Sequence, residues 1–356
     1  MATSGTVGRT VINVQQLIDH GARRCGKLAE ELTSEQQTSA RESLFFALSS
    51  LANIGINYWA INKEVIGLTA NQYVYELPIG SIDVLNALYR RLNRPSPNSL
   101  GGYLASSGVV ANAFDNNTDT ICTQTAVNGY IGINYGTDQP IYAGSIGILP
   151  GVSGTFKILL EYSTDGTTWS TLYDTGTEIW VDDQWLWYDI DRGQNVQYYR
   201  MRETGGNTLS VREFYVGNNS TEITMSRLNR DDYTNLPNKN FTANQPFQFW
   251  FDRTIPQPKM YLWPVPSDPF VQMTIWYSRQ IQDVGALQDQ LEVPQRWYEA
   301  IVFMLAHRMS LELPNVATDR IGYLEKMATQ YLGEAELEER DKSPIMIAPN
   351  ISVYTR

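Results

Sequence analysis

Cysteine and histidine are scarce in this chain of 356 residues, which contains two of each. Cys25 and Cys122 are too few for a disulfide scaffold, and two free thiols suit a protein made in a reducing cytoplasm. His20 and His307 both fall inside helical patterns and lie far apart in the sequence. Because no Cys/His cluster is present, the sequence favours neither a zinc site nor a Cys–His nucleophile pair.

Long apolar runs are also missing from the sequence. No stretch reaches the roughly eighteen apolar residues of a membrane helix, and Met1 to Thr10 contain no apolar core of the kind found in signal peptides. We therefore expect neither a membrane span nor secretion, and no membrane partner.

Catalytic motifs are absent as well. The sequence contains no GxSxG elbow, P-loop, Rossmann fingerprint or HExxH. Two acidic pairs occur, Asp182-Asp183 and Asp231-Asp232. Neighbouring carboxylates point to opposite faces of a strand and diverge on a helix, so neither pair predicts the acid and base of a glycosidase. We expect no enzyme, no catalytic residue and no organic cofactor.

Positive charge is in the minority, with 27 Lys and Arg against 38 Asp and Glu and a net charge of −11. Residues 96–219 alone hold 13 acidic and 5 basic side chains, so most of the net charge belongs to that segment. A protein this acidic does not bind duplex DNA by neutralising its phosphates.

Apolar and aromatic residues are plentiful, with 42% apolar residues, 21 Tyr and 9 Trp. Such a chain folds and carries many of the side chains that anchor interfaces. Its length favours two domains over one. Apolar spacing predicts a helical hairpin from residues 14–32 and 34–52, then strands at 59–69, 72–77 and 84–92.

The stretch from Phe247 to Tyr277 alternates aromatic and apolar residues between proline-rich turns. This pattern predicts a three-stranded antiparallel meander, which is too small to stand alone and should lean on helices. Further amphipathic helices are predicted from residue 292 to Pro314 and over residues 317–332.

Residues 94–102 are rich in Pro, Gly and Ser, which marks a domain boundary, and residues 103–217 read as short alternating strands of a β-sandwich. This segment resembles the discoidin, or coagulation-factor type C, jelly roll. The resemblance is carried in order by Ala113-Phe-Asp-Asn-Asn-Thr-Asp-Thr120, Tyr130-Ile-Gly-Ile-Asn-Tyr-Gly136, Glu161-Tyr-Ser-Thr-Asp-Gly-Thr-Thr-Trp169, Tyr198-Tyr-Arg-Met-Arg202 and Val211-Arg-Glu-Phe-Tyr-Val216.

The discoidin-like resemblance implies a carbohydrate- or surface-binding module with a structural calcium in some members. The positions carried over for calcium are Asp115, Asn117, Thr120 and Glu213, although Ile121 stands where the family usually has Trp. Oxygen ligands of this kind suit calcium, and the alternative is a turn built by Asx hydrogen bonds. For sugar binding the candidates are Trp180 and Trp185, with a core or interface role as the alternative.

The flanking segments resemble the head-to-tail adaptor of short-tailed bacteriophages. The blocks are Arg230-Asp-Asp-Tyr233, Asn238-Lys239, Gln245-Pro246, Asp252-Arg253, Met260-Tyr-Leu-Trp-Pro-Val-Pro266, Leu291-Glu-Val-Pro294, Arg296-Trp297 and Leu305-Ala306. The resemblance implies a homo-oligomeric ring of twelve copies between the portal protein and the tail nozzle protein. Double-stranded DNA would pass through that ring without sequence-specific binding.

An extended C-terminal arm reaches the portal in the adaptor family, and its apolar residues here are Ile345, Met346, Ile347, Ile351, Val353 and Tyr354. An apolar tail beyond the charged run from Glu334 to Lys342 calls for a partner surface.

The sequence therefore predicts an α+β protein, in which a helical-bundle adaptor domain with a small antiparallel sheet is interrupted by an all-β jelly-roll sandwich. The expected boundaries are 1–95 and 220–335 for the adaptor domain, 96–219 for the inserted sandwich and 336–356 for the arm. The expected function is a structural virion protein of the tail connector, assembled in the host cytoplasm. The alternative is a carbohydrate-binding adhesin that acts through the sandwich.

Overall fold

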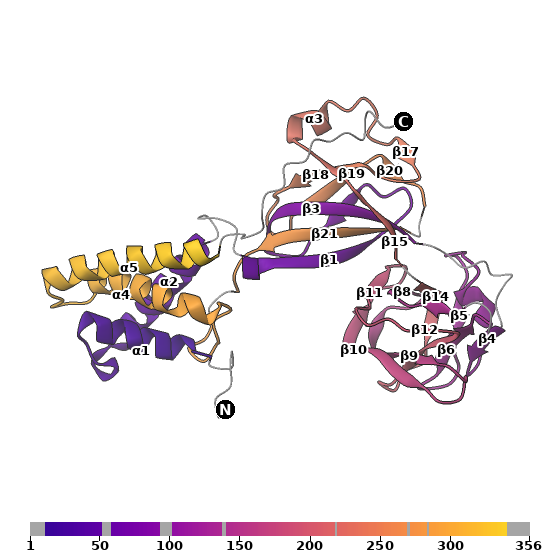
Figure 1. Ribbon diagram of the computed structural model, residues 1–356, viewed down its shortest axis with the longest axis horizontal. Helices are drawn as coiled ribbons and strands as arrows, with labels where there is room; N and C mark the ends of the chain where they lie inside the picture. The colour runs from indigo at the N-terminus through magenta and orange to yellow at the C-terminus, as the bar shows by residue number, and fades with distance from the viewer. Residues whose placement is uncertain are drawn as a thin grey trace, which may run out of the picture. The chain divides into compact units, whose positions relative to one another are not determined.

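The computed structural model describes residues 11–51, 58–92, 102–136, 140–217, 219–268, 271–282 and 285–339 (Figure 1). The chain divides into two compact units, residues 1–61 with 278–356 and residues 62–277. The expected boundaries at 95 and 219 fall within the second unit and stay a prediction. The strands of the flanking segments group with the sandwich, while the helices from the two ends of the chain group with one another.

The first unit is helical. Its elements are α1 (Val14–Cys25), η1 (Ala29–Glu31), α2 (Ser34–Leu51), η2 (Tyr58–Ala60), η5 (Gln295–Trp297), α4 (Tyr298–Glu312) and α5 (Thr318–Glu338). Asn13 caps α1 by accepting a hydrogen bond from the Gln16 backbone N–H at 2.8 Å. The helix ends at Gly26, whose φ of 83° is left-handed, which is why α1 is shorter than the apolar spacing predicts.

Helix α4 is the centre of the helical unit and packs against α1, α2 and α5. Its buried side chains include Phe303 and Leu305, and Trp297 directly before it is 2% exposed. Trp297 meets Trp59 edge to face at 4.9 Å between ring centroids. The apolar stripes read from the sequence therefore form one shared core.

The second unit begins with two four-stranded sheets. One has the order β1-β21-β3-β15, with bounds Ile61–Leu68, Val271–Arg279, Ser81–Leu92 and Asn219–Thr224. The other has the order β16-β18-β19-β2, with bounds Ser226–Leu228, Gln248–Asp252, Lys259–Trp263 and Val74–Glu76. Apolar residues of both sheets, among them Tyr89, Phe249 and Met273, share one core, so each sheet packs on the other.

The expected three-stranded meander is wrong in its third strand. Strands β18 and β19 do pair antiparallel, but β21 lies between β1 and β3 in the other sheet. Pro264 and Pro266 lack the N–H that a continuing ladder needs. The intervening strand β20 (Val265–Pro266) pairs with β17 (Thr242–Ala243) instead, and the small sheet leans on a second sheet.

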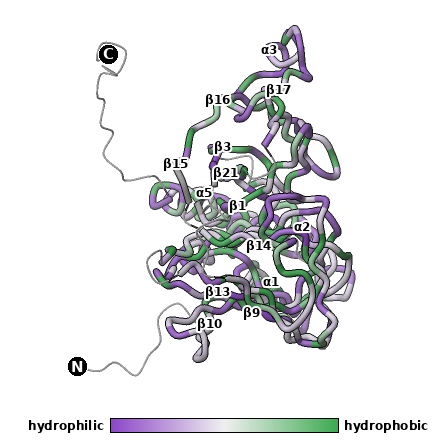
Figure 2. Tube along the Cα trace, turned by 90° about the vertical axis from the view of Figure 1, so that its right-hand side faces the viewer, coloured by the Kyte–Doolittle hydropathy of each residue, from purple (hydrophilic) through white to green (hydrophobic). Residues whose placement is uncertain are grey.

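The short helix α3 (Arg230–Thr234) follows β16 and is hydrophilic along most of its length (Figure 2). Asn229 caps it by accepting from the Asp232 backbone N–H at 2.7 Å. Tyr233 is its buried residue and stacks on Trp250 of β18 at 5.2 Å. One aromatic contact thus fixes the helix on the sheet.

The sandwich expected over residues 103–217 is present. A five-stranded sheet has the order β10-β9-β13-β6-β4, with bounds Ser170–Trp180, Gly154–Ser163, Tyr198–Glu203, Tyr130–Asn134 and Gly102–Ala105. A four-stranded sheet has the order β11-β8-β14-β5, with bounds Leu186–Asp189, Ser145–Pro150, Ser210–Gly217 and Cys122–Thr123. The ribbon β7 (Ile141–Tyr142) and β12 (Asn195–Val196) and the short η4 (Val110–Ala113) complete it.

Apolar residues of both sandwich sheets, including Ile133, Ile148 and Trp180, form the sandwich core. The protein as described is therefore a mixed α and β structure with several sheets. None of the helices in the described ranges combines the length and the apolarity that a membrane span needs.

Candidate functional site

The sandwich meets the first pair of sheets along strand β1, where Gly67 lies under two tryptophans. A Cβ at Gly67 would lie 2.6 Å from the Trp185 Cβ and 2.7 Å from the Trp187 Nε1. Side chains two apart on a strand share a face, so Trp185, Trp187 and Asp189 all point from the β11 segment toward β1. Only glycine leaves room for this approach.

Trp187 is held on every side by small or aromatic neighbours. Trp185 stacks on it at 4.6 Å between centroids and 17° between planes, and Tyr215 meets it edge-on at 5.6 Å. A Cβ at Gly147 of β8 would come within 2.2 Å of the Trp187 ring. The indole therefore fills a slot between Gly67 and Gly147, which locks β11 against β1.

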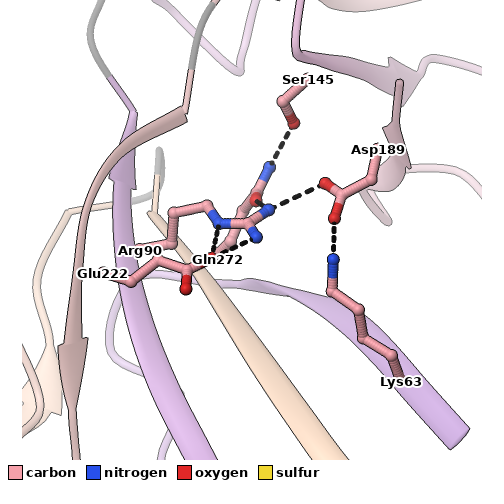
Figure 3. A network of polar contacts seen from close by, with 6 residues as sticks. All are labelled: Lys63, Arg90, Ser145, Asp189, Glu222 and Gln272. Atoms are coloured by element: carbon pink, nitrogen blue, oxygen red, sulfur yellow. Dashed lines mark hydrogen bonds and ion pairs between the residues drawn. The ribbon is translucent and has the colours of Figure 1, made fainter. Parts of the chain in front are cut away.

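Next to this aromatic slot lies a charge network centred on the buried Arg90 (Figure 3). The Arg90 side chain is 2% exposed. Its guanidinium donates to Asp189 of the sandwich at 2.8 Å and to Glu222 of β15 at 2.5 Å and 3.1 Å. A further bond of 3.3 Å reaches the Gln272 Oε1. One side chain thus joins three strands of the sheet, β3, β15 and β21, to the sandwich.

Two more contacts complete the network. Lys63 of β1 forms an ion pair and hydrogen bond with Asp189, and the Gln272 Nε2 donates to the Ser145 Oγ of the sandwich at 3.3 Å. Figure 3 shows Arg90 between Glu222 and Asp189, with Lys63 on the far side of the Asp189 carboxylate. A buried guanidinium is stable only when its donors find acceptors, and Glu222, Asp189 and Gln272 accept from four of the five N–H groups.

The network shifts the proton affinities of its members. Burial alone would raise the pKa of the Asp189 carboxyl, but the hydrogen bonds and charges of Lys63 and Arg90 outweigh it and lower the pKa. For Arg90, burial opposes the charged form, while the bonds to Glu222 and Asp189 raise its pKa. We define the junction as Gly67, Trp187, Arg90 and Asp189 with their neighbours. Its Arg90–Asp189 pair is therefore ionised at neutral pH.

A cleft of about 530 Å³ opens beside the junction. It is lined by Glu64, Val65, Ile66, Gly67, Thr69, Gln72, Val74, Tyr75, Glu76, Gln184, Trp185 and Lys259. Burial in this cleft raises the pKa of Glu64. Glu76 lies 3.6 Å from Lys259 across the edge of the β19–β2 pair. The lining therefore combines two carboxylates, one ammonium group and an indole.

The two predicted sugar-binding tryptophans differ in how far they are exposed to solvent. Trp180 is fully buried in the sandwich core and stacks on Phe156 at 4.3 Å. It has no exposed face for a sugar ring, so the core alternative holds for this residue. Trp185 is partly exposed, because it lies at the junction and lines the cleft.

The predicted calcium ligands are not arranged as one cluster of acidic groups. Asp115 accepts from the Asn117 backbone N–H at 2.9 Å and from the Thr120 Oγ1 at 2.8 Å, which are the bonds of an Asx turn. Glu213 is buried, with 3% of its surface exposed. Within the described ranges, no three His, Cys, Asp or Glu side chains are grouped so as to hold a metal. Calcium binding stays a prediction.

The arm residues Ile345, Met346, Ile347, Ile351, Val353 and Tyr354 lie outside the described residues, which end at Glu339.

Sequence reasoning missed the junction. Arg90, Asp189 and Gly67 are not neighbours in the sequence, and no motif connects them. One signal was available, because Trp187 and Asp189 alternate along a short strand, with Trp185 directly before it in the same phase, so the three side chains would share a face. An alternating face of two indoles and a carboxylate on a short strand indicates a contact with another layer.

Comparison with solved structures gave matches that cover about a third of this chain. No family model and no curated protein matches the sequence. The solved structure "CBM32 of AlyQ in complex with 4,5-unsaturated mannuronic acid" is 17% identical and matches over 33% of this chain and 94% of that chain, with a TM-score of 0.29. Chitosan-binding module 1 of a Paenibacillus sp. IK-5 chitosanase/glucanase is 20% identical over 35% of this chain and 96% of its own length, also with a TM-score of 0.29.

A third solved structure of this kind is CpGH89CBM32-6 from Clostridium perfringens, which is 16% identical and covers 33% of this chain and 93% of its own, again with a TM-score of 0.29. At this TM-score the likeness to these carbohydrate-binding modules supports no argument about function. The sandwich itself is established by its own strand pairing and core.

Proposed function

We propose that this chain is a structural connector subunit of a short-tailed bacteriophage virion. Copies of it would form a ring, twelve by resemblance, that joins the portal to the tail nozzle and lines part of the DNA exit channel. The proposal assigns no catalytic activity, no cofactor and no sequence-specific DNA binding. The family resemblance is carried by the short sequence blocks of the flanks.

The observation that supports a structural role best is the closed junction. A binding module on a flexible mount would need only a linker, whereas here a glycine slot for Trp187 and a buried Arg90 fix the sandwich against strands β1, β3, β15 and β21. Burying a guanidinium is costly unless every bond is made, so such a contact is retained where relative position matters. A subunit of a ring under DNA pressure needs modules that do not move against one another.

The helical unit supplies a second observation. Large apolar side chains stand exposed on it, among them Phe46 at 58%, Leu311 at 65% and Tyr323 at 56%. Ring contacts between copies are heterologous and need two different complementary patches on each subunit. Exposed apolar residues on helices from both chain ends supply candidates for such patches.

The role of the arm is tested by a truncation and by a substitution in the full-length chain. Helix α5 runs to Glu338, three residues into the expected arm of 336–356. A truncation after Arg340 keeps the whole helix, so it should leave the melting temperature unchanged while portal co-sedimentation is lost. Val353→Asp should weaken docking at least tenfold, because it places a charge in an apolar contact. The matched control is Ser352→Asp, which adds the same charge at a polar neighbour. Undiminished docking of the truncated chain contradicts the assignment of the arm.

Carbohydrate binding through the sandwich is the second candidate. It is favoured by one observation, the cleft in which Trp185 lies beside Gln184 and two carboxylates, because an indole with polar neighbours is a common sugar-binding surface. The test is a glycan array probed with the wild type and with Trp185→Phe. Binding that is lost in the variant would promote this candidate, and a blank array would remove it.

A further inference from the structure

The cleft beside the junction lies between two strand edges. Strand β1 is the outermost strand of its sheet and β2 is the outermost strand of the other. They follow one another in the chain, joined by residues 69–73, but in the described part of the chain each pairs only on its other side. Residues 64–67 and 74–76 line the cleft consecutively, so backbone edges as well as side chains face it. Open edges of this kind accept an added strand.

The walls of the cleft are fixed in advance. The Tyr75 hydroxyl accepts from the Thr69 backbone N–H at 3.0 Å and is 3.1 Å from the Gln72 carbonyl oxygen, to which it donates. These bonds tie the turn between β1 and β2 to the core. On the other side, Trp185 is stacked on Trp187. A segment that binds there would therefore meet a preformed cleft, and little binding free energy would be lost to rearrangement of its walls.

The charges of the cleft favour a cationic occupant. Among the described residues, no cation forms an ion pair with Glu64, and Glu76 has only the 3.6 Å contact with Lys259. Lys63, which neighbours Glu64, points to the other face and is held by Asp189. A guanidinium placed between Glu64 and Glu76 would meet two carboxylates, which are the usual partners of a bound arginine.

One segment of this chain that lies outside the described residues fits these requirements. Residues 1–10 contain one charged side chain, Arg9, with no acidic residue and no proline, and the rest are small or β-branched apart from Met1. Ten residues span about 33 Å when extended, enough to run along the eight residues of β1. Residues 340–356 fit less well, because Pro344 and Pro349 lack donors for a ladder.

We propose that the cleft receives the segment Met1 to Thr10 of a second copy of this chain as an added strand along β1, with Arg9 between Glu64 and Glu76. The cleft and the segment Met1 to Thr10 would then be one pair of complementary surfaces in the proposed ring. The inference rests on the proposed ring only in taking the occupant from a second copy of this chain.

The binding step is tested by calorimetry with a peptide of residues 1–12. The receptor is the full-length chain carrying Arg9→Glu, so that its own segment does not compete. We expect the wild-type peptide to bind and the Arg9→Glu peptide to bind at least tenfold more weakly. A receptor that carries Glu64→Lys and keeps Arg9, so that its own segment again mismatches the cleft, should show the reverse preference. The Arg9→Glu receptor with Glu30→Lys, an equal charge change on the exposed η1, should not. Absence of peptide binding, or equal binding of both peptides, overturns the proposal.

The identity of the donor is tested by mixing two variants that carry one added cysteine each, Val7→Cys and Thr69→Cys. The natural thiols Cys25 and Cys122 are buried and should not interfere. We expect the mixture to give a disulfide-linked product of twice 40.3 kDa in which peptide mapping finds one copy of each variant. No such mixed product is expected when Thr329→Cys on the exposed face of α5 replaces Thr69→Cys. A link that forms only within a chain carrying both cysteines contradicts the exchange between copies.

These two tests distinguish a failure of the strand-exchange proposal from a failure of the ring proposal. Peptide binding is measured without any ring, so a chain that never assembles can still show the charge-dependent binding. If a neutral oligosaccharide binds the cleft in a Trp185-dependent manner while the peptide does not, the cleft is a sugar site and the proposal is overturned.

Discussion

Arg90 and Asp189 are 99 positions apart in the sequence, and their side chains meet at 2.8 Å where the sandwich contacts strand β3. Asp189 also pairs with Lys63, so the carboxylate bridges two cations on two strands of the same sheet. The pair therefore fixes the position of the sandwich on the sheet that contains β3. Its removal should lower the free energy of unfolding more than it changes the fold of the sandwich or of that sheet.

Replacing Arg90 by Ala should lower the free energy of unfolding of the second unit by about 3 kcal/mol. The value lies at the lower end for a broken buried pair, because Lys63 still neutralises Asp189. Urea unfolding followed by tryptophan fluorescence measures it. The control is Arg24→Ala, whose partner Glu299 is exposed, and its cost should stay below about 1 kcal/mol. Equal costs for both variants would show that the network contributes little.

Gly67→Ala should destabilise the junction by about 1–3 kcal/mol, because the new methyl group would lie within 2.7 Å of both tryptophans. Gly322→Ala on α5 is the matched control, since a Cβ there meets nothing within 4 Å. The control should be neutral or stabilising by up to about 1 kcal/mol. Thermal unfolding of both variants checks the difference, and a neutral Gly67→Ala would mean that the tryptophans can move aside.

Acid should weaken the junction through Asp189. Its pKa is lowered in the folded protein from the ordinary value of 3.8, so its contribution is fully present above that pH and is lost as the pH falls through the lower folded value. The difference in unfolding free energy between wild type and Asp189→Asn should therefore stay constant from pH 7 to about 5 and shrink below pH 3.8. A difference that grows on acidification contradicts this sign.

Trp180 and Trp185 should behave differently when replaced by Ala. Trp180 is fully buried against Phe156, so its loss should cost about 3–5 kcal/mol. Trp185 is partly exposed and should cost less. If glycan binding is detected, only Trp185→Ala should remove it without lowering the melting temperature of the sandwich strongly. A mild effect of Trp180→Ala would mean that the core repacks around the cavity.

Local structure was readable from the sequence where one residue type dictates it. The apolar stripes of α2 and α4, the stop at Pro314 and the sandwich strands follow from periodicity and proline chemistry. The grouping of elements into units was not readable, because whether β21 follows β19 or crosses to β3 depends on long-range packing. Trp180 and Trp185 look alike in sequence, and only their strand positions decide which faces the core.

The central claim is that copies of this chain form a closed ring that binds a portal, and the mass of the assembly tests it most directly. Multi-angle light scattering of the purified chain, with and without the portal of the same virion, should give a discrete complex containing twelve copies of the 40.3 kDa chain. A chain that remains a monomer at all concentrations, and that still remains one when the portal is added, would contradict the account.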